Sequence, residues 1–555
     1  MAPTPGILYV TMQPKPGLPV DQFHDWYNNE HGPLRVRLPF FNNGFRYRAS
    51  DLKGEEGSEA KPEWMAIYDV TDMAEMNEEA YTRLRGPPSK TPREAETMVQ
   101  IKVDRKLFDF LESRESKEFR RLEDVGNEGQ GNVMIAVFID LQPGEDKREQ
   151  LDKWYREEHI EMLSKVPGWL RTRRFVTSSG DPQAPVEYLA LHEYAPKNGL
   201  GGPEFVAATT SPWNKEVMSK VIKEKRRRTY DLYYTFGPAP RYLSPKLSNW
   251  SSTDPQHAYV TKSFSTSTVK APAGAIESYI TTPDGVTLPY LLEGSADPSA
   301  PLIVLTNSIL VTRGIWDNFL KSFFSSTPNQ KYRVLRYLTR GRSSDCGTKP
   351  ITVDVLAADI IAILDALRVK KAVAVIGVSL GGATVLNTAL KYPDRVASFI
   401  SCDTSSKSPA GNSKAWGDRI AVCEKENAIS STSGEKIVGK ELADMTVRRW
   451  FVKENHDTPE MERIKEMVET NSLEGFKSSV RALFEYDLKE EMKSSQVKGM
   501  FLVGGGDGVL PGTMKEMAGA YGKSGADYKI IENAGHLPMV EKPEEFAGVV
   551  TSFLG

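Results

Sequence analysis

Apolar and polar positions follow two different patterns along the 555-residue chain, and the change falls near residue 275. Before it, apolar runs such as Ile7–Thr11 and Val133–Ile139 alternate with polar, helix-like stretches. After it, short apolar runs such as Leu302–Leu305 recur between amphipathic helical segments such as Val353–Leu367. The first pattern predicts mixed α+β structure. The second predicts a largely parallel sheet with helices on both faces.

The first half of the chain contains an internal repeat. Trp26–His31 (WYNNEH) recurs as Trp154–His159 (WYREEH). In both copies one strand precedes this segment and others follow it, at Gly44–Arg48, Glu63–Tyr68, Gly168–Arg173, Glu187–His192 and Thr229–Thr235. The order strand-helix-strand-strand-helix-strand is ferredoxin-like, so we expect one such repeat over residues 1–120 and another over 121–237.

The tandem repeat resembles the EthD-like branch of the dimeric α+β-barrel superfamily, in which two such units pack sheet to sheet. The resemblance implies that both copies form one α+β barrel within the chain, as a monomer or as a homodimer through this barrel. His31 and His159 end the two helical segments and are candidates for an acid/base or ligand site. Packing with a buried hydrogen bond is the favoured alternative, because so short a motif is weak evidence of chemistry.

Residues 238–274 have the Ser/Thr/Pro-rich composition of a linker. Beyond it we expect one α/β domain over 275–555, with a helical cap over about 404–498. Its further strands are predicted at Tyr332–Tyr337, Ala372–Ile376, Val396–Ser401, Met500–Val503 and Tyr528–Glu532. The cap is inferred because the chain between two of these strands has a mainly helical pattern.

Composition narrows the classes of partner. The net charge of -3 gives no basic footprint, so we expect no nucleic-acid partner. The three cysteines, Cys346, Cys402 and Cys423, lack CxxC spacing, which argues against a disulfide framework and a zinc site. No signal-like N-terminus and no run of ~20 apolar residues is present, so we expect a cytoplasmic protein without a membrane partner. We also expect no metal and no cofactor, only a small-molecule substrate.

The strongest chemical motif is Gly377-Val-Ser379-Leu-Gly381. It follows the strand predicted at Ala372–Ile376 and opens a helix at Gly382–Leu390, the context of the nucleophile elbow. Its glycines allow the tight turn that projects a serine hydroxyl. The motif therefore predicts an α/β-hydrolase domain with Ser379 as nucleophile.

A serine nucleophile needs a base, and in this fold the chain order is serine, acid, histidine. Only His456 and His536 follow Ser379. His456 lies in a polar, turn-like stretch typical of a solvated residue, which leaves His536 as the base. The acid is predicted to be Asp507, in a glycine-rich turn after a strand; Asp403, directly after another strand, is the alternative.

The oxyanion hole requires backbone amides that point to the developing negative charge. One is expected from Leu380, the residue after the nucleophile. The other is expected from Ile309, in the loop after strand Leu302–Leu305. Many relatives of this fold carry His-Gly where this chain has Asn307-Ser308.

Several segments together resemble 3-oxoadipate enol-lactone hydrolase: Leu305–Ser308, Trp316-Asp317, Arg333–Tyr337, Thr339–Gly341, Cys402–Ser406, Trp416, Arg419-Ile420, Arg449–Phe451 and Ala482–Leu488. The resemblance covers about 275–555 and implies the opening of a small enol-lactone that bears a carboxylate. Trp416 and Arg419 are then candidates for substrate binding, Arg419 equally for a salt bridge within the cap; for Arg449 the structural role is favoured. The chain departs from the family at Asp403, Leu338 and Arg342, which puts the substrate in doubt.

The sequence therefore predicts a serine hydrolase that opens a small lactone or cleaves an ester. An active barrel that isomerises, decarboxylates or cyclises the substrate would make the chain bifunctional. A hydrolase of carbon–carbon bonds in 1,3-diketones is a further alternative, because fold and triad do not determine substrate. A catalytically silent binding module is the alternative from another class, but it would not need serine, histidine, acid and elbow together.

Overall fold

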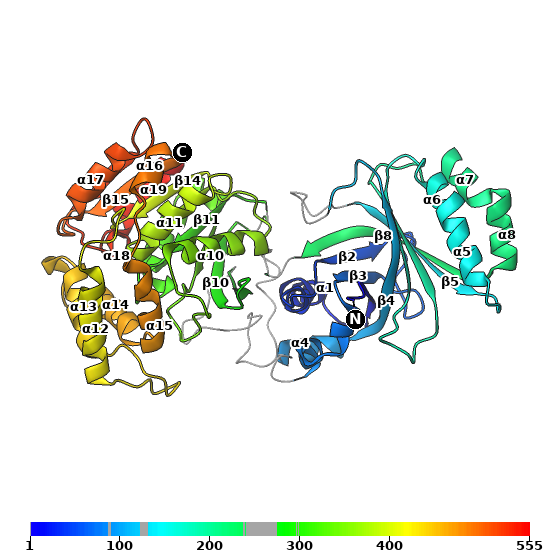
Figure 1. Ribbon diagram of the computed structural model, residues 1–555, viewed down its shortest axis with the longest axis horizontal. Coiled ribbons are helices and arrows are strands. Elements are labelled where there is room, and N and C mark those ends of the chain that lie inside the picture. Colours follow the sequence, from blue (N-terminus) through cyan, green and yellow to red (C-terminus); the bar gives the residue numbers. More distant parts are fainter. Residues whose placement is uncertain are drawn as a thin grey trace. The chain divides into compact units, whose positions relative to one another are not determined.

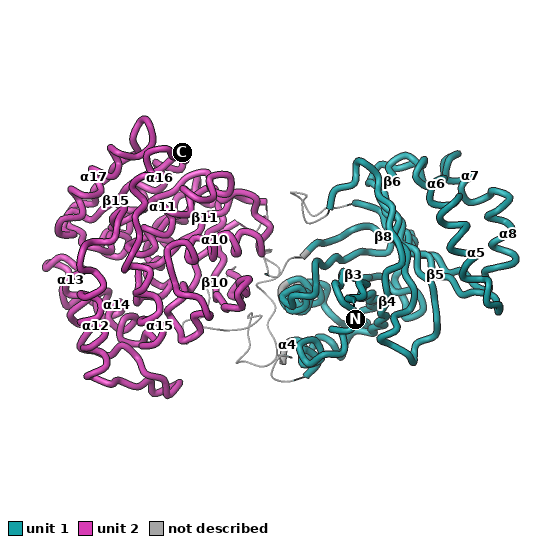
Figure 2. Tube along the Cα trace, in the orientation of Figure 1, with its two compact units in different colours: residues 1–240, 250–258 teal, residues 241–249, 259–555 magenta. Residues whose placement is uncertain are grey.

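The computed structural model describes residues 2–86, 90, 92–121, 131–236, 239, 275–295, 297 and 299–555. The chain divides into two compact units (Figure 2), residues 1–240 with 250–258 and residues 241–249 with 259–555. The linker predicted at 238–274 lies outside the described residues except for residue 239.

Unit 1 is built around a closed barrel of antiparallel strands in the order β1-β3-β2-β8-β5-β7-β6-β4. The strands are β1 Gly6–Pro14, β2 Gly44–Ala49, β3 Trp64–Val70, β4 Ile101–Glu115, β5 Val133–Leu141, β6 Trp169–Thr177, β7 Tyr188–Tyr194 and β8 Ile222–Phe236. The two halves have the same strand order, β4-β1-β3-β2 and β8-β5-β7-β6. Pairing of β2 with β8 and of β4 with β6 joins the halves, so the barrel closes within one chain and leaves no sheet edge.

Alternate strand residues point to opposite faces of a sheet, and the inner face of this barrel is buried, whereas parts of β4 and β8 are exposed. The interior is filled by side chains such as Tyr9, Ile67 and Phe138. Helices cover the outer face: α1 Val20–Trp26, α2 Gly32–Val36, α3 Glu79–Thr82, α4 Pro92–Met98, α5 Lys147–Trp154, α6 Ile160–Leu163, α7 Pro203–Thr210 and α8 Pro212–Lys220 (Figure 1).

The repeated Trp-Tyr-x-x-Glu-His segments, predicted to be helical, are not regular α-helix. Tyr27–His31 and Tyr155–His159 each form a π-helical turn, η1 and η5, between two short α-helices. A π turn inserts an extra residue per turn and is frequent at functional sites. It places the histidine of each copy beneath the helix layer, where both are buried.

Unit 2 contains an eight-stranded sheet in the order β16-β15-β14-β13-β11-β12-β10-β9. Its strands are β9 Ile276–Thr281, β10 Thr287–Gly294, β11 Leu302–Thr306, β12 Arg333–Tyr337, β13 Ala374–Val378, β14 Ser398–Cys402, β15 Lys498–Gly504 and β16 Asp527–Ile531. Pairing is antiparallel from β9 to β12 and parallel from β12 to β16. The prediction of Ala372–Ile376 as a strand was two residues early, because Ala372 forms only an isolated bridge with Val396.

Helices cover this sheet: α9 Asp317–Ser325, α10 Val353–Ala366, α11 Leu380–Lys391, α17 Leu510–Ala520, α18 Pro538–Glu541 and α19 Pro543–Leu554. Between β14 and β15 the chain is mainly helical, with α12 Asn412–Glu426, α13 Lys440–Trp450, α14 Pro459–Glu469, α15 Leu473–Ser479 and α16 Lys489–Ser494. Figure 1 shows α12 to α15 grouped beside the sheet, and we call this group the cap. Within the described ranges, no helix has the length and hydropathy that a membrane crossing requires.

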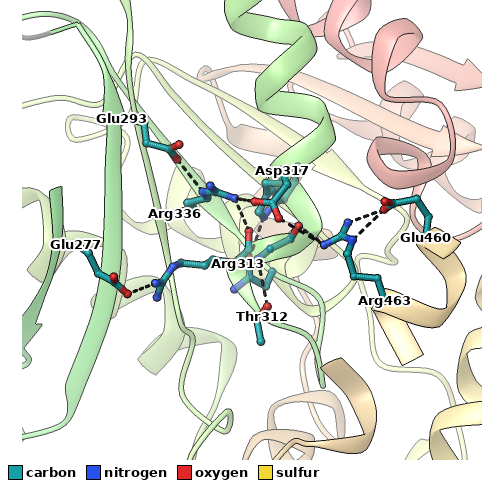
Figure 3. Close-up of polar contacts among 11 residues, drawn as sticks. Glu277, Glu293, Thr312, Arg313, Asp317, Arg336, Glu460 and Arg463 are labelled. Atoms are coloured by element: carbon teal, nitrogen blue, oxygen red, sulfur yellow. Dashed lines mark hydrogen bonds and ion pairs between the residues drawn. The ribbon is translucent and has the colours of Figure 1, made fainter. Parts of the chain in front are cut away.

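Ion pairs connect the sheet to the cap (Figure 3). Arg336 on β12 donates to Glu293 on β10 at 2.8 Å and to Asp317 at the start of α9. Arg463 on α14 pairs with Asp317 at 3.5 Å and donates to the Gly314 carbonyl at 2.9 Å. Arg336 is buried, so loss of a carboxylate partner would leave an uncompensated charge. The network thereby holds the segment that follows β11 against both sheet and cap.

Candidate active site

Ser379 lies at a strained turn between β13 and α11. Its backbone angles are φ 61° and ψ −118°, a conformation that non-glycine residues rarely adopt. A Cβ on Gly377 would come within 2.2 Å of the Gly381 carbonyl oxygen, and one on Gly381 within 2.4 Å of the Thr306 carbonyl oxygen. The two glycines of the motif are therefore required by close backbone packing, as the elbow interpretation expects.

His536 and Asp507 are in direct contact. The His536 Nδ1 and the Asp507 Oδ2 lie 2.7 Å apart, in the loops that follow β16 and β15. Burial acts to raise the pKa of Asp507, but the neighbouring His536 imidazole outweighs it and holds that pKa below its usual range. The carboxylate is therefore ionised and fixes the orientation of the ring.

The loop of His536 is held from the cap side by contacts that the sequence did not indicate. The Trp450 carbonyl accepts from the His536 backbone amide at 2.7 Å, and the Trp450 ring stacks on the imidazole at 5.6 Å. Glu541 accepts from the Gly535 amide at 2.6 Å and from the Val452 amide at 3.1 Å. A glutamate in a short helix carries no sequence signal for this role.

Asp403 lies beside this pair, but its carboxylate bonds to a backbone amide, whereas that of Asp507 bonds to the imidazole. It is 1% exposed, and its Oδ1 accepts from the Gly504 amide at 2.9 Å. Carboxylate oxygens of Asp403 and Asp507 and a ring nitrogen of His536 all lie within 4.8 Å of one another. Burial and the negative charge of Asp507 raise the pKa of Asp403 well above its usual range. Two buried carboxylates this close do not both ionise, so the inner one, Asp403, keeps its proton.

The same trio could offer three ligand atoms to a metal ion. However, the His536 Nδ1 already bonds to Asp507, and the Asp403 Oδ1 already accepts from the Gly504 amide. These donors therefore fit a hydrogen-bonded acid–imidazole pair better than a metal centre.

The predicted oxyanion loop is fixed at its base. Asn307 donates from Nδ2 to the Tyr337 carbonyl at 2.7 Å, and its Oδ1 accepts from Trp316 Nε1 at 2.9 Å. Ile309 is buried, and Leu380 occupies the first position of α11, where a backbone N–H has no acceptor within the helix. The asparagine that replaces the usual histidine is thus a structural anchor of the loop.

Trp416 and Arg419 lie on α12, and Arg449 lies on α13. The Arg419 guanidinium stacks over the Trp416 ring at 4.6 Å and donates to the Ala415 carbonyl at 2.9 Å. Burial and the charge of Arg419 lower the pKa of Arg449, while the Asp507 carboxylate acts in the opposite direction. Within the described part of the chain, neither arginine forms an ion pair with a carboxylate. Arg449 thus lies within electrostatic range of Asp507 and of Arg419, although neither arginine is held in an ion pair.

The remaining predicted positions have structural partners. Arg342 donates to Thr470 Oγ1 at 2.7 Å and to Asn471 Oδ1 at 3.2 Å, which ties it to the cap. His456 is partly buried and its Nε2 lies 3.1 Å from the Arg448 carbonyl, away from the triad candidates. His31 and His159 belong to unit 1, where their Nδ1 atoms bond to Glu94 at 2.7 Å and to the Ala208 carbonyl at 3.2 Å.

Comparison with known proteins identifies the fold of the C-terminal unit. The family model of the alpha/beta hydrolase fold matches residues 301–543. The C-terminal unit is an α/β-hydrolase. It resembles 3-oxoadipate enol-lactonase 2 of Acinetobacter baylyi, 27% identical over 278 residues that cover 49% of this chain and 95% of that protein. The α/β-hydrolase unit is therefore consistent with an enzyme that hydrolyses an ester or lactone.

Two further relatives of the α/β-hydrolase unit differ in coverage. Zearalenone hydrolase of Bionectria ochroleuca is 35% identical over 124 residues, 21% of this chain and 44% of that protein. The crystal structure of the enol-lactonase from Burkholderia xenovorans is 26% identical with a TM-score of 0.43, and the match covers 50% of this chain and 99% of that one.

Proposed function

We propose that the chain is a serine hydrolase that opens a small lactone or cleaves an ester by a Ser379–His536–Asp507 triad. The observation that carries the proposal is the 2.7 Å bond between Asp507 and His536, in the same unit as a serine held at φ 61°. The bond holds the imidazole tautomer in which Nε2 is free to accept a proton.

In the proposed reaction the Ser379 Oγ attacks the carbonyl carbon while His536 Nε2 takes the hydroxyl proton. The carbonyl oxygen becomes an oxyanion, which the amides of Ile309 and Leu380 stabilise. The ring C–O bond then breaks, and His536 returns the proton to the leaving oxygen. Water repeats the sequence on the acyl-enzyme and releases the acid.

We further propose that the substrate carries a carboxylate. Arg419 and Arg449 lack a carboxylate partner in the described chain, and a guanidinium binds a carboxylate in a bidentate, orienting manner. An enol-lactone-type substrate fits this requirement, in line with the names of the enol-lactonase relatives.

For unit 1 we propose that each half of the barrel is a ferredoxin-like repeat of the EthD-like type. The support is the equal strand order of the two halves and the recurrence of the Trp-Tyr-x-x-Glu-His segment at the same place in each.

The test is Ser379→Ala, assayed with an enol-lactone and with an activated ester. Loss of a complete nucleophile should lower kcat by about 10⁴-fold or more while the fold is retained. A fluorophosphonate should label the wild-type chain and not the variant. Ser433→Ala, at an exposed cap position, is the matched control and should keep both properties. Retained turnover in the Ser379 variant would contradict the mechanism.

A further inference from the structure

The second half of the barrel in unit 1 contains a cavity of about 90 Å³ between the sheet and its helices. Figure 1 shows the helices α5 to α8 that cover this face beside β5. The lining includes apolar residues of β5 and of the helices together with His159, His192, Tyr194, Lys225 and Arg227. The walls are mostly apolar, with a few polar groups at defined positions, which is the usual composition of a small-molecule site.

The first polar group is His159, at the end of the π turn η5. Its Nδ1 lies 3.2 Å from the Ala208 carbonyl, and its ring stacks on Trp154 at 4.1 Å. A carbonyl only accepts, so Nδ1 carries the proton. Burial lowers the pKa of His159 to about 3, so the ring is neutral. Its Nε2 is therefore a hydrogen-bond acceptor.

The second polar group is His192 on β7, whose ring centre lies 6.2 Å from that of His159. The Thr172 hydroxyl accepts from Trp169 Nε1 at 3.1 Å and lies 3.0 Å from His192 Nδ1. Among the described residues, His192 Nδ1 is the acceptor within reach of the Thr172 hydroxyl proton, so we assign that proton to the bond with Nδ1. The neutral ring then carries its own proton on Nε2. His192 thus offers a donor where His159 offers an acceptor.

The third polar group is the Tyr194 hydroxyl. Tyr194 is 0% exposed, and its hydroxyl has no hydrogen-bond partner among the described residues. A buried hydroxyl normally has a hydrogen-bond partner, and this one lies where a ligand or a water in the cavity can supply it. This observation is independent of the two imidazoles and concerns the same cavity.

The charge of the cavity has one sign. Lys225 and Arg227 on β8 line it, and none of the lining residues is acidic. Neither cation forms an ion pair within the described ranges. Both residues are exposed to solvent; partial burial and the charge of Arg227 still lower the pKa of Lys225, as expected for two neighbouring cations.

In the first half of the barrel, the residues that correspond to His159 and His192 have partners within the chain. There His31, which corresponds to His159 in the repeat, binds the Glu94 carboxylate at 2.7 Å. Tyr68, at the place of His192, bonds to the Tyr27 hydroxyl at 2.8 Å. The first copy thus supplies a carboxylate from its own chain, whereas the second copy offers its groups to a cavity whose described lining contains none.

We propose that this cavity binds a small organic carboxylate that also carries a hydroxyl group on an apolar body. The carboxylate accepts from His192 Nε2 and the Tyr194 hydroxyl and is balanced by Arg227 and Lys225. The ligand hydroxyl donates to His159 Nε2. The apolar body lies against the β5 side chains, of which Ile135 and Ile139 line the cavity.

The test uses the full-length chain and 3-hydroxybenzoate as probe. Two matched compounds serve for comparison: benzoate, which lacks the hydroxyl group, and 3-hydroxybenzamide, which lacks the negative charge. Calorimetry should show saturable binding of 3-hydroxybenzoate with a Kd of about 1 mM or below, with the amide at least about tenfold weaker and benzoate weaker by a smaller factor. The chain has seven histidines, so imidazole ¹⁵N spectra separate this site from the hydrolase site. The probe should shift the signals of His159 and His192.

Variants locate the binding. Tyr194→Phe removes only the hydroxyl and should weaken binding by about tenfold, because a hydrogen bond to a charged group is lost. Arg227→Gln should weaken the binding of 3-hydroxybenzoate and benzoate and leave the affinity for 3-hydroxybenzamide unchanged. Lys223→Gln, an exposed position on the same strand that does not line the cavity, is the control. Equal binding of acid and amide, shifts confined to His536, no saturable binding, or an unchanged Kd in Tyr194→Phe would each overturn the proposal.

Discussion

Asp403→Asn separates the two candidates for the triad acid. Asparagine keeps the Oδ1 that accepts from the Gly504 amide at 2.9 Å, and it is uncharged like the protonated carboxyl. The hydrogen bond and the charge state of the neutral acid are therefore both retained. We expect kcat/KM to stay within about threefold of wild type, whereas Asp507→Asn, which no longer fixes the imidazole tautomer, should lose about 10⁴-fold in kcat.

The same substitution has a predicted effect on stability. The pKa of Asp403 is raised in the folded chain by burial and by Asp507, so the folded state binds more protons than the unfolded state above the ordinary aspartate pKa. Stability from this group is present at low pH and is lost as the pH rises toward the folded pKa. An asparagine side chain does not titrate, so the Asp403→Asn variant should gain in free energy of unfolding relative to wild type as the pH rises from about 4 to 8.

The assay combines turnover of an activated ester with urea unfolding at several pH values. Asp403→Ala is the contrasting variant, because it leaves the Gly504 amide without an acceptor and should cost about 1–3 kcal/mol of stability. The reasoning is refuted if Asp403→Asn loses activity by more than about 100-fold in a folded protein while Asp507→Asn remains active. That result would assign the acid to Asp403.

Two further predictions concern charge. Arg449→Gln should raise the KM of a carboxylate-bearing lactone about tenfold and leave the KM of a neutral ester nearly unchanged. Arg448 pairs with Asp444 at 3.0 Å, so Arg448→Gln is the control and should change neither KM. Equal effects of Arg449→Gln on both substrates would exclude a carboxylate clamp. Burial lowers the pKa of His192 to about 3, so between about pH 6.5 and 4 the unfolded chain takes up a proton that the folded barrel does not, and stability falls by about 3 kcal/mol. Hydrogen exchange of barrel amides should show this fall in wild type and a smaller one in His192→Gln; an equal fall would contradict the assignment.

The sequence was most informative where a local pattern has a direct physical cause. Short apolar runs predicted most strands of both units, because strands buried on both faces are continuously apolar. The strands β4, β9 and β10 were not predicted. The boundaries of β13 were less accurate, since Gly377 and Val378 look like part of a turn but continue the parallel ladder with Ser401 and Cys402. The glycines of the elbow were predicted correctly as backbone requirements.

Contacts between distant segments could not be predicted in this way. The sequence left Asp403 and Asp507 as alternatives, because both follow strands that end at the same edge of the sheet. Only the arrangement in space places Asp507 at 2.7 Å from the His536 ring and Asp403 behind it. The hydrogen bond from the Gly535 amide to Glu541, which fixes the loop of His536, likewise depends on the fold and could not be predicted from the sequence.

The partners of three buried or partly buried imidazoles explain why this chain can use the same side chain differently. His536 and His31 both have a carboxylate at Nδ1, at 2.7 Å in each case, which fixes the orientation of the ring. For His31, burial and the neighbouring Arg35 outweigh Glu94 and lower the pKa to about 4, so that ring is neutral. For His536 the second nitrogen is then suited to take a proton from a nucleophile. His159 has only a carbonyl at Nδ1, which sets the tautomer but supplies no charge. An imidazole of that kind is suited to bind a ligand hydroxyl rather than to hold a proton, so the barrel cavity calls for a binding assay before a kinetic one.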